Sequence, residues 1–187
     1  SDTQDVTIFA LATLAEYRDN EMGAHIMRTQ SYVRGLARYL MTQPKFKNHV
    51  NPEVIDILYK SAPLHDIGKV GAPDHILLKS DQLTHDEFQT MKKHTIYGLE
   101  VITKSEQTLG VDPKTSFLRY AREIAYTHHE KWDGSGYPQG LAGEDIPLSG
   151  RIMAIADVYD ALISKRAYKP AFSHLTAIER KRSTFRP

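Results

Sequence analysis

The fold is decided by residues 62–70, which read Ala62-Pro63-Leu64-His65-Asp66-Ile67-Gly68-Lys69-Val70. This segment places an imidazole and a carboxylate side by side, between apolar residues spaced to anchor in a core. Burying a carboxylate costs several kcal/mol unless it is paired or bound to a metal ion. His65 and Asp66 therefore form either a buried hydrogen bond or part of a metal site, and the segment alone favours neither. We expect Pro63 to end the preceding helix and Gly68 to let the backbone leave helical geometry after the pair.

The composition limits the classes of protein to which the chain can belong. With 187 residues it is long enough for one sizeable core, and we expect a single domain over residues 1–187. The formal net charge of +1 at pH 7 gives no reason to expect binding to nucleic acid polymers or anionic membranes. The absence of Cys excludes disulfides and thiolate zinc sites, and it fits a reducing, cytoplasmic compartment. No apolar run reaches membrane-spanning length, and no signal-peptide pattern opens the chain.

Apolar residues recur at helical spacing, and no segment shows sustained strand alternation, so we predict an all-α bundle of about seven helices. The clearest expected helices cover residues 6–17, 24–41, 52–62, 85–102, 116–130 and 148–165. The third begins at Pro52, a residue suited to the first helical position. The fourth begins at the capping-box spacing of Thr84 and Glu87. We find no internal repeat and no low-complexity tract.

Acidic and histidine side chains lie at the ends or on the apolar faces of these expected helices. The candidates are Glu21, His25, His65, Asp66, His94, His128, His129 and Asp157. Each has an ordinary explanation when taken alone. Glu21 and His25 can be a capping glutamate and an interfacial histidine, and His94 can be a satisfied core histidine. Asp157 lies within a strongly apolar helix and would need a partner if it were buried.

His128 and His129 close the helix expected over residues 116–130. Adjacent residues of a helix project about 100° apart, so both cannot serve one simple i,i+4 chelate. They reach two different ions, or one is a ligand while the other forms a hydrogen bond. The sequence leaves both alternatives open.

Taken together, the candidates predict a cluster of metal ions. Nitrogen and carboxylate ligands without sulfur suit iron, manganese, zinc or cobalt. So many ligands exceed the needs of one ion with an open position, and we expect two or three divalent ions bridged by Asp66. Such clusters neutralise phosphate charge during in-line displacement. Lys69 could hold a phosphoryl oxygen, and Arg166 and Lys169 could clamp a second phosphate. The residues alone therefore predict metal-assisted hydrolysis of a phosphoester in a small anionic substrate.

Two motifs resemble a known family over about residues 3–169. They are His65-Asp66-Ile67-Gly68-Lys69 and His128-His129-Glu130-Lys131-Trp132-Asp133-Gly134-Ser135-Gly136-Tyr137-Pro138. Together they resemble the HD-GYP subgroup of the HD phosphohydrolase superfamily. The resemblance implies a bacterial phosphodiesterase that converts cyclic di-GMP to linear pGpG, and further to GMP where a third metal is present. One alternative is hydrolysis of 3',3'-cyclic GMP-AMP, because nothing in the sequence distinguishes a guanine edge from an adenine edge. Another is a degenerate cyclic-dinucleotide receptor, which the intact ligand set disfavours.

The resemblance also implies roles for individual residues. It matches the metal ligands to His25, His65, Asp66, His94, His128, His129 and Asp157, and it matches Glu21 to a glutamate of members with three metals. We expect iron or manganese, with zinc, cobalt or nickel as alternatives in purified protein. The implied catalytic residues are Asp66 and Lys69, of which Lys69 contacts the scissile phosphate. The implied substrate-binding residues are Lys69, Tyr137, Arg166 and Lys169.

The resemblance further implies partners and a longer parent chain. The loop that contains Tyr137 is associated with docking of diguanylate cyclase (GGDEF) domains, and we also consider a homodimer. Family members usually carry an N-terminal receiver or sensor domain. We therefore expect this chain to be a catalytic domain excised from a longer protein, with the last helices after Phe172 truncated.

Overall fold

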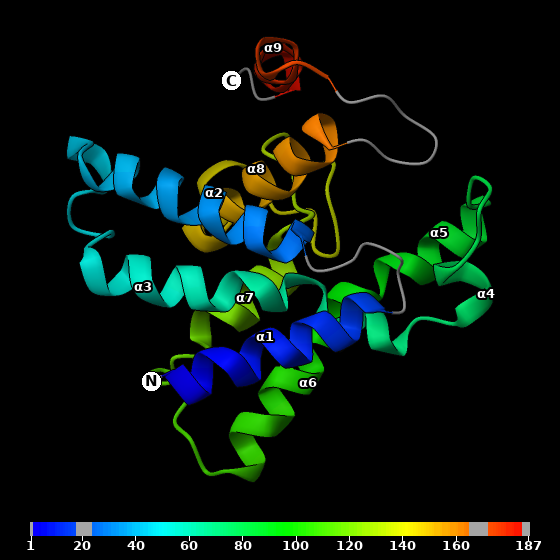
Figure 1. Cartoon of the computed structure of the whole chain (residues 1–187), viewed down its shortest axis with the longest axis horizontal. Helices are drawn as coiled ribbons and strands as arrows, with labels where there is room; N and C mark the ends of the chain where they lie inside the picture. Colours follow the sequence, from blue (N-terminus) through cyan, green and yellow to red (C-terminus); the bar gives the residue numbers. More distant parts are fainter. Residues whose placement is uncertain (1, 18–23, 165–171, 185–187) are drawn as a thin grey trace.

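A computed structural model describes residues 2–17, 24–164 and 172–184, which form a bundle of helices (Figure 1). The α-helices are α1 (Asp2–Tyr17), α2 (Ala24–Met41), α3 (Pro52–Ser61), α4 (Asp74–Leu77), α5 (His85–Lys92), α6 (His94–Thr108), α7 (Arg119–Thr127), α8 (Leu148–Ile163) and α9 (His174–Thr184). Three 3₁₀ segments are η1 (Pro44–Phe46), η2 (Ala62–Gly71) and η3 (Gly143–Asp145). Within the described ranges there is no β-strand, apart from one isolated bridge between Asp133 and Ala142, so the predicted all-α class is confirmed.

The described chain has more helices than the predicted seven or so, partly because the helix expected over residues 85–102 divides at Lys93. The His94 imidazole donates a hydrogen bond to the Met91 carbonyl at 2.7 Å, and the Thr95 hydroxyl donates to the Lys92 carbonyl at 2.9 Å. Side chains that bond to nearby carbonyls compete with the helical ladder. The break therefore accompanies the orientation of His94, whose side chain belongs to the candidate site.

The 3₁₀ segment η2 lies at the centre of the bundle and packs against α1, α2, α3, α6 and α7 (Figure 1). α3 ends at Ser61, two residues before Pro63, which confirms the predicted helix end. A proline ring clashes with the preceding turn and offers no N–H to an α-helical ladder. The chain then continues in the tighter 3₁₀ geometry through residues 62–71, with His65 and Asp66 buried.

The expectation that the backbone would leave helical geometry after His65 and Asp66 is wrong, because the 3₁₀ geometry continues to Gly71. Gly68 is instead required for the close packing of η2 on α6. A Cβ atom at Gly68 would lie 1.9 Å from the His94 carbonyl oxygen and 2.4 Å from the Gly98 nitrogen. Only a residue without a side chain lets η2 cross α6 so closely. This crossing brings the His65-Asp66 pair next to His94.

Two apolar clusters hold the segments around η2. The larger consists of Val33, Ala37, Val50, Ile55, Leu58, Ala62, Ile124, Ile152, Met153 and Ala156, and the smaller of Ile8, Leu64, Ile102, Ala121 and Ala125. The larger cluster joins α2, α3, α7 and α8, and the smaller joins α1, η2, α6 and α7. Burial of this apolar surface is the main favourable contribution to folding.

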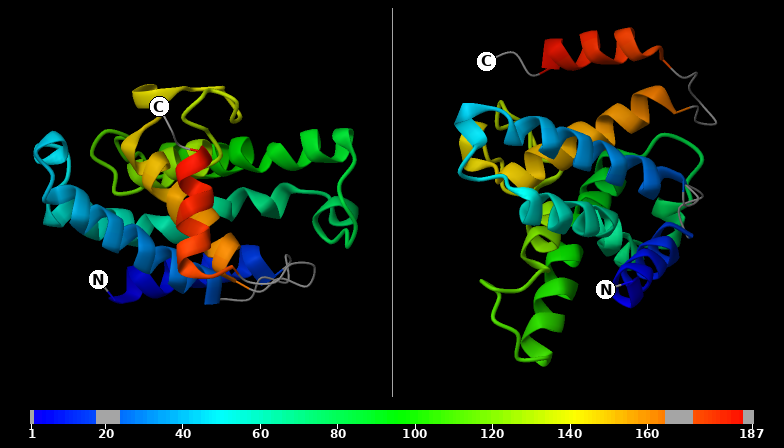
Figure 2. Two further views of the ribbon diagram at one scale, coloured as in Figure 1. Left: turned by 90° about the horizontal axis from the view of Figure 1, so that it is seen from above. Right: turned by 60° about the vertical axis from the view of Figure 1, so that its left-hand side comes forward.

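α9 packs against α8 at the outer edge of the bundle, as the two views of Figure 2 show. The Tyr159 hydroxyl lies 2.7 Å from the His174 Nδ1, and Ala177 is fully buried. Among the helices in the described ranges, none is both long and apolar enough to cross a membrane.

The start of α5 shows the predicted capping box and leads to a pH prediction. The Glu87 carboxylate accepts hydrogen bonds from Lys79 Nζ at 2.6 Å and from the Thr84 backbone N–H at 2.7 Å. These bonds, with that of Lys79 the largest, lower the pKa of Glu87 from 4.5 to about 2. Because the folded pKa is the lower one, the ionised carboxylate stabilises the fold above about pH 4.5. That stabilisation is lost as the pH falls toward about 2.

We expect Glu87→Gln to unfold at a lower temperature than the parent protein at pH 7, because Gln keeps an acceptor but loses the charge. The difference should narrow as the pH falls below about 4.5, where the parent also begins to lose this contribution. Thermal unfolding followed by circular dichroism over a pH series measures both effects. A difference that stays constant through acid pH would contradict the assignment.

Candidate metal centre

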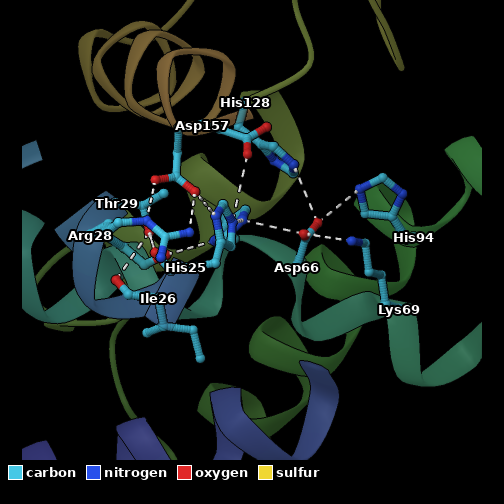
Figure 3. Close-up of polar contacts among 12 residues, drawn as sticks. His25, Ile26, Arg28, Thr29, Asp66, Lys69, His94, His128 and Asp157 are labelled. Atoms are coloured by element: carbon cyan, nitrogen blue, oxygen red, sulfur yellow. Dashed lines mark hydrogen bonds and ion pairs between the residues drawn. The ribbon is translucent and has the colours of Figure 1, made fainter. Parts of the chain in front are cut away.

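Histidine and aspartate side chains from α2, η2, α6, the turn after α7, and α8 converge beside η2 (Figure 3). One group is Asp66, His94, His128 and His129, and the other is His25, His65 and Asp157; in each, the ligand atoms lie within 4.8 Å of one another. All the predicted ligands except Glu21 are in these two groups. Glu21, Arg166 and Lys169 lie outside the described residues. The roles of the clustered residues as ligands stay a prediction that this convergence supports.

Asp66 belongs to the first group and also contacts His65 of the second (Figure 3). Its Oδ1 atom is 3.4 Å from His94 Nε2 and 3.6 Å from His128 Nε2. Its Oδ2 atom is 3.2 Å from His65 Nε2 and 2.9 Å from Lys69 Nζ. Burial raises the pKa of Asp66, but the charges of Lys69 and His65 outweigh burial and hold it well below the ordinary value. The side chain is therefore an anion placed to interact with both groups.

Four of the five clustered imidazoles share a second arrangement, in which a hydrogen-bond partner holds Nδ1. Nδ1 donates to the Ala62 carbonyl in His65 (2.9 Å), to the Met91 carbonyl in His94 (2.7 Å), to the Ile124 carbonyl in His128 (2.9 Å) and to Asp160 Oδ2 in His25 (2.7 Å). A histidine that donates from Nδ1 offers Nε2 as its ligand atom. The four Nε2 atoms accordingly face the same region around Asp66 and Asp157.

The donor set and its unsatisfied atoms fit a cluster of divalent cations. Asp66 Oδ1, His94 Nε2 and His128 Nε2 are buried without a hydrogen-bond partner. Each such atom costs about 1–3 kcal/mol unless it is satisfied. Burial lowers the pKa of His94 to about 4, and burial together with the charge of His128 holds the pKa of His129 well below its ordinary value. His94 and His129 are therefore neutral near pH 7, as metal ligation requires.

His65 differs from these two histidines. Burial lowers its pKa, but the carboxylate of Asp66 outweighs burial and raises it to about 9. Cation binding at His65 would therefore displace a proton, and metal affinity should rise with pH.

His128 and His129 lie in one group although they are neighbours in sequence. The helix expected to reach residue 130 ends at Thr127, so the 100° separation of helical neighbours does not apply to the pair. Their ring centroids are 4.0 Å apart, and that of His129 is 5.1 Å from that of His94. The two imidazoles can therefore serve the same ion, an arrangement that the expected helix ruled out.

Asp160 is an important residue of the site that the sequence patterns do not single out. It is only 1 % exposed, and it accepts hydrogen bonds from His25 Nδ1 at 2.7 Å and from Arg28 Nε at 2.6 Å. Burial raises the pKa of Asp160, but these bonds outweigh it and lower the pKa to about 2. A carboxylate in this position sets the tautomer and ring orientation of a metal-binding histidine. One available signal was its spacing of three residues from Asp157, on the same face of α8.

We expect Asp160→Asn to weaken metal binding by about 10- to 100-fold, because the uncharged amide holds His25 and Arg28 less firmly. Competition with a chromogenic chelator measures the affinity. Asp56→Asn is the matched control, since Asp56 is an exposed carboxylate paired with Lys60 at 2.9 Å. An Asp160→Asn variant that binds metal as tightly as the control would argue against this orienting role.

The loop after α7 places an aromatic ring against the centre. The Tyr137 ring stacks on His129, with centroids 4.7 Å apart and an interplanar angle of 25°. The buried Glu130 carboxylate holds the loop by accepting the backbone N–H groups of Gln139 at 2.8 Å and Leu141 at 3.0 Å. Burial raises the pKa of Tyr137, which keeps the phenol neutral. This position supports the prediction that Tyr137 contacts substrate.

Comparisons with known proteins extend these observations. Residues 11–184 match the HD domain family. The chain is 60% identical over 172 residues to a cyclic di-GMP phosphodiesterase of Vibrio cholerae, covering 92% of this chain and 34% of the relative. It is 57% identical over 171 residues to a probable cyclic di-GMP phosphodiesterase of that organism, covering 91% and 38%.

A third relative from Vibrio cholerae is named 3'3'-cGAMP-specific phosphodiesterase 2. It is 44% identical over 169 residues, which cover 90% of this chain and 29% of the relative. The chain thus spans about a third of the length of the curated relatives it matches. On the family match and these identities, the chain belongs to the HD domain family and, within it, to the HD-GYP group.

Proposed function

We propose that this chain is a metal-dependent phosphodiesterase that hydrolyses cyclic di-GMP. The observation that carries the proposal is the pair of His/Asp groups, which Asp66 of the first group joins through its contact with His65 of the second. Lys69 Nζ lies 2.9 Å from that same carboxylate. Clustered divalent ions next to a phosphate-binding cation are suited to in-line displacement at phosphorus. Relatives 60% and 57% identical to the chain are named for cyclic di-GMP, which supports the choice of substrate.

The metal ions are proposed to be iron or manganese, two or three per chain. They would be held by His25, His65, Asp66, His94, His128, His129 and Asp157. When bound, such ions make water nucleophilic near neutral pH and offset the negative charge of the reacting phosphate. The protein's own contribution is to hold the imidazoles in the tautomer and orientation that direct Nε2 toward the cluster.

Lys69 is proposed to bind the scissile phosphate. Its side chain is 18% exposed and lies on η2 one turn beyond Asp66, with its ammonium directed at the carboxylate. A phosphate oxygen bound beside Asp66 would lie near this ammonium. A fixed positive charge at that place stabilises the charge that develops on the phosphate during displacement. Tyr137 is proposed to contact the substrate at the edge formed with His129. The roles of Arg166, Lys169 and Glu21, docking of a GGDEF domain, and a homodimer stay predictions.

A second candidate substrate is 3',3'-cyclic GMP-AMP. It is supported by the relative named for 3'3'-cGAMP, which is 44% identical to the chain. The higher identities to the relatives named for cyclic di-GMP favour that substrate. Both are cyclic dinucleotides with the same phosphodiester chemistry, so the described site serves either one.

The test is turnover by the metal-reconstituted protein with each dinucleotide, with products separated by chromatography and bound metal measured by elemental analysis. We expect pGpG from cyclic di-GMP, further cleavage to GMP if a third ion is bound, and slower hydrolysis of 3',3'-cyclic GMP-AMP. A chelator should stop the reaction, and Mn²⁺ or anaerobic Fe²⁺ should restore it. A reconstituted protein that holds fewer than two ions, or that cleaves neither substrate, would overturn the proposal.

A further inference from the structure

Glu16 is a buried acidic residue outside the predicted ligand set. It lies in the last turn of α1 and is only 4 % exposed. Neither of its carboxylate oxygens has a hydrogen-bond partner. An unpaired carboxylate is strongly unfavourable in a protein interior unless a positive charge or a donor compensates for it. A position that retains one therefore needs an explanation.

Other buried acidic residues in the described part of the chain have partners. Glu106 pairs with Arg122 through Oε2, although its Oε1 has no hydrogen-bond partner. Glu130 accepts two backbone N–H groups, and Asp160 is held by a histidine and an arginine. Asp66 has one buried oxygen without a hydrogen-bond partner and lies in the candidate metal centre. Across the described ranges, Glu16 is the one buried glutamate whose two oxygens both lack a partner.

The surroundings of Glu16 connect it to the metal centre. α1 packs directly on η2, the segment that carries His65 and Asp66 (Figure 1). Burial raises the pKa of Glu16 to about 7, and the groups whose charges act on it are His25, His65, Asp66 and Lys69. Each of these lies in one of the two ligand groups or contacts Asp66. The carboxylate is thus within electrostatic range of the place where cations are proposed to bind.

We propose that Glu16 is an additional acidic residue of the metal centre, serving a cation at the His25–His65–Asp157 group through an intervening water. Its oxygens are not among the atoms that lie within 4.8 Å of one another, which argues against direct coordination. A water between carboxylate and cation satisfies otherwise unpaired oxygens, as buried waters commonly do. The inference rests on the proposed metal-dependent function, and it adds a residue five positions before the predicted ligand Glu21.

This role predicts opposite effects of Glu16 with and without metal. Without cations, the buried carboxylate destabilises the fold, because neither oxygen has a hydrogen-bond partner and burial outweighs the nearby positive charges. With cations bound, the same charge favours the loaded protein. A residue that only supports the packing of α1 would instead contribute equally to both states.

The test compares Glu16→Gln, which has nearly the same shape without the charge, with the parent protein. Mn²⁺ affinity is measured by chelator competition, and melting temperatures are measured with and without Mn²⁺. We expect at least about 10-fold weaker Mn²⁺ binding and a smaller Mn²⁺-induced rise in melting temperature. The metal-free variant should melt at or above the temperature of the metal-free parent.

Glu106→Gln is the matched control, because Glu106 is equally buried but lies near the far end of α6 from His94. It loses its ion pair with Arg122, so the metal-free control should melt at a lower temperature, with Mn²⁺ affinity unchanged. Glu16→Asp keeps the charge and should bind Mn²⁺ more tightly than Glu16→Gln, since a water can bridge the shorter side chain.

Mn²⁺ affinity decides the result. An unchanged affinity in Glu16→Gln, or Glu16→Asp binding no more tightly than Glu16→Gln, would overturn the inference. These outcomes are distinct from failure of the proposed function, which would appear as a parent protein that binds fewer than two Mn²⁺ ions or cleaves no cyclic dinucleotide.

Discussion

Asp66→Asn should reduce cyclic di-GMP hydrolysis by at least on the order of 100-fold and lower the metal content of the purified protein. The wild-type carboxylate lies within 3.6 Å of the Nε2 atoms of His65, His94 and His128 and within 2.9 Å of Lys69 Nζ. Asn has nearly the same shape, but it removes the negative charge that would help to hold cations at this site. Its amide can also turn an N–H donor toward nitrogen atoms that must stay available as ligands.

Turnover by chromatography and metal per chain by elemental analysis measure the two effects of this change. Asp56→Asn, on the exposed side of α3, should retain both properties. Asp66→Asn with parental turnover and metal content would rule out Asp66 as a metal ligand that the reaction requires. If instead turnover were lost while dinucleotide-dependent signalling persisted, the result would favour the receptor function considered above.

Gly68→Ala should destabilise the protein by about 3 kcal/mol or more, at the upper end of the range for overpacked sites. The added Cβ would meet the His94 carbonyl oxygen at 1.9 Å and the Gly98 nitrogen at 2.4 Å. Both are backbone atoms, so neither can move without shifting α6. Because that shift separates His94 from Asp66, we also expect weaker metal binding.

Chemical denaturation measures this loss, and Gly35→Ala is the matched control. Gly35 lies within α2, and a Cβ atom there has no neighbour within 4 Å. The control should therefore be more stable than the parent by about 0.5–1 kcal/mol, the usual gain of Ala over Gly in a helix. If Gly68→Ala were as stable as the parent, the crossing of η2 and α6 would be looser than described.

Local sequence signals predicted much of the secondary structure. α2 has the expected bounds, Ala24–Met41, and α5 begins with the expected capping box of Thr84 and Glu87. Pro63 ends α3 as expected. These features depend on neighbours in the chain, which is why periodicity, capping and proline geometry were sufficient to predict them.

The prediction failed at two helix boundaries that apolar periodicity does not mark. The division at Lys93 accompanies hydrogen bonds from the His94 and Thr95 side chains to carbonyls three residues earlier. α7 ends at Thr127 with His128 as its C-cap, so His129 lies beyond the helix and the spacing rule for two helical neighbours does not apply to the pair.

The amino-acid sequence by itself determined which chemistry this protein can carry: imidazoles and carboxylates without thiols, in motifs that identify the family. The tertiary structure alone decided which of these groups meet. It brought Asp66 into contact with histidines of both groups, held His25 with Asp160, and buried Glu16 without a hydrogen-bond partner on the helix that packs on η2. The physical reason is that ligand type is a property of each residue, whereas desolvation and distance arise only when α1, α2, α6, α7 and α8 pack around η2.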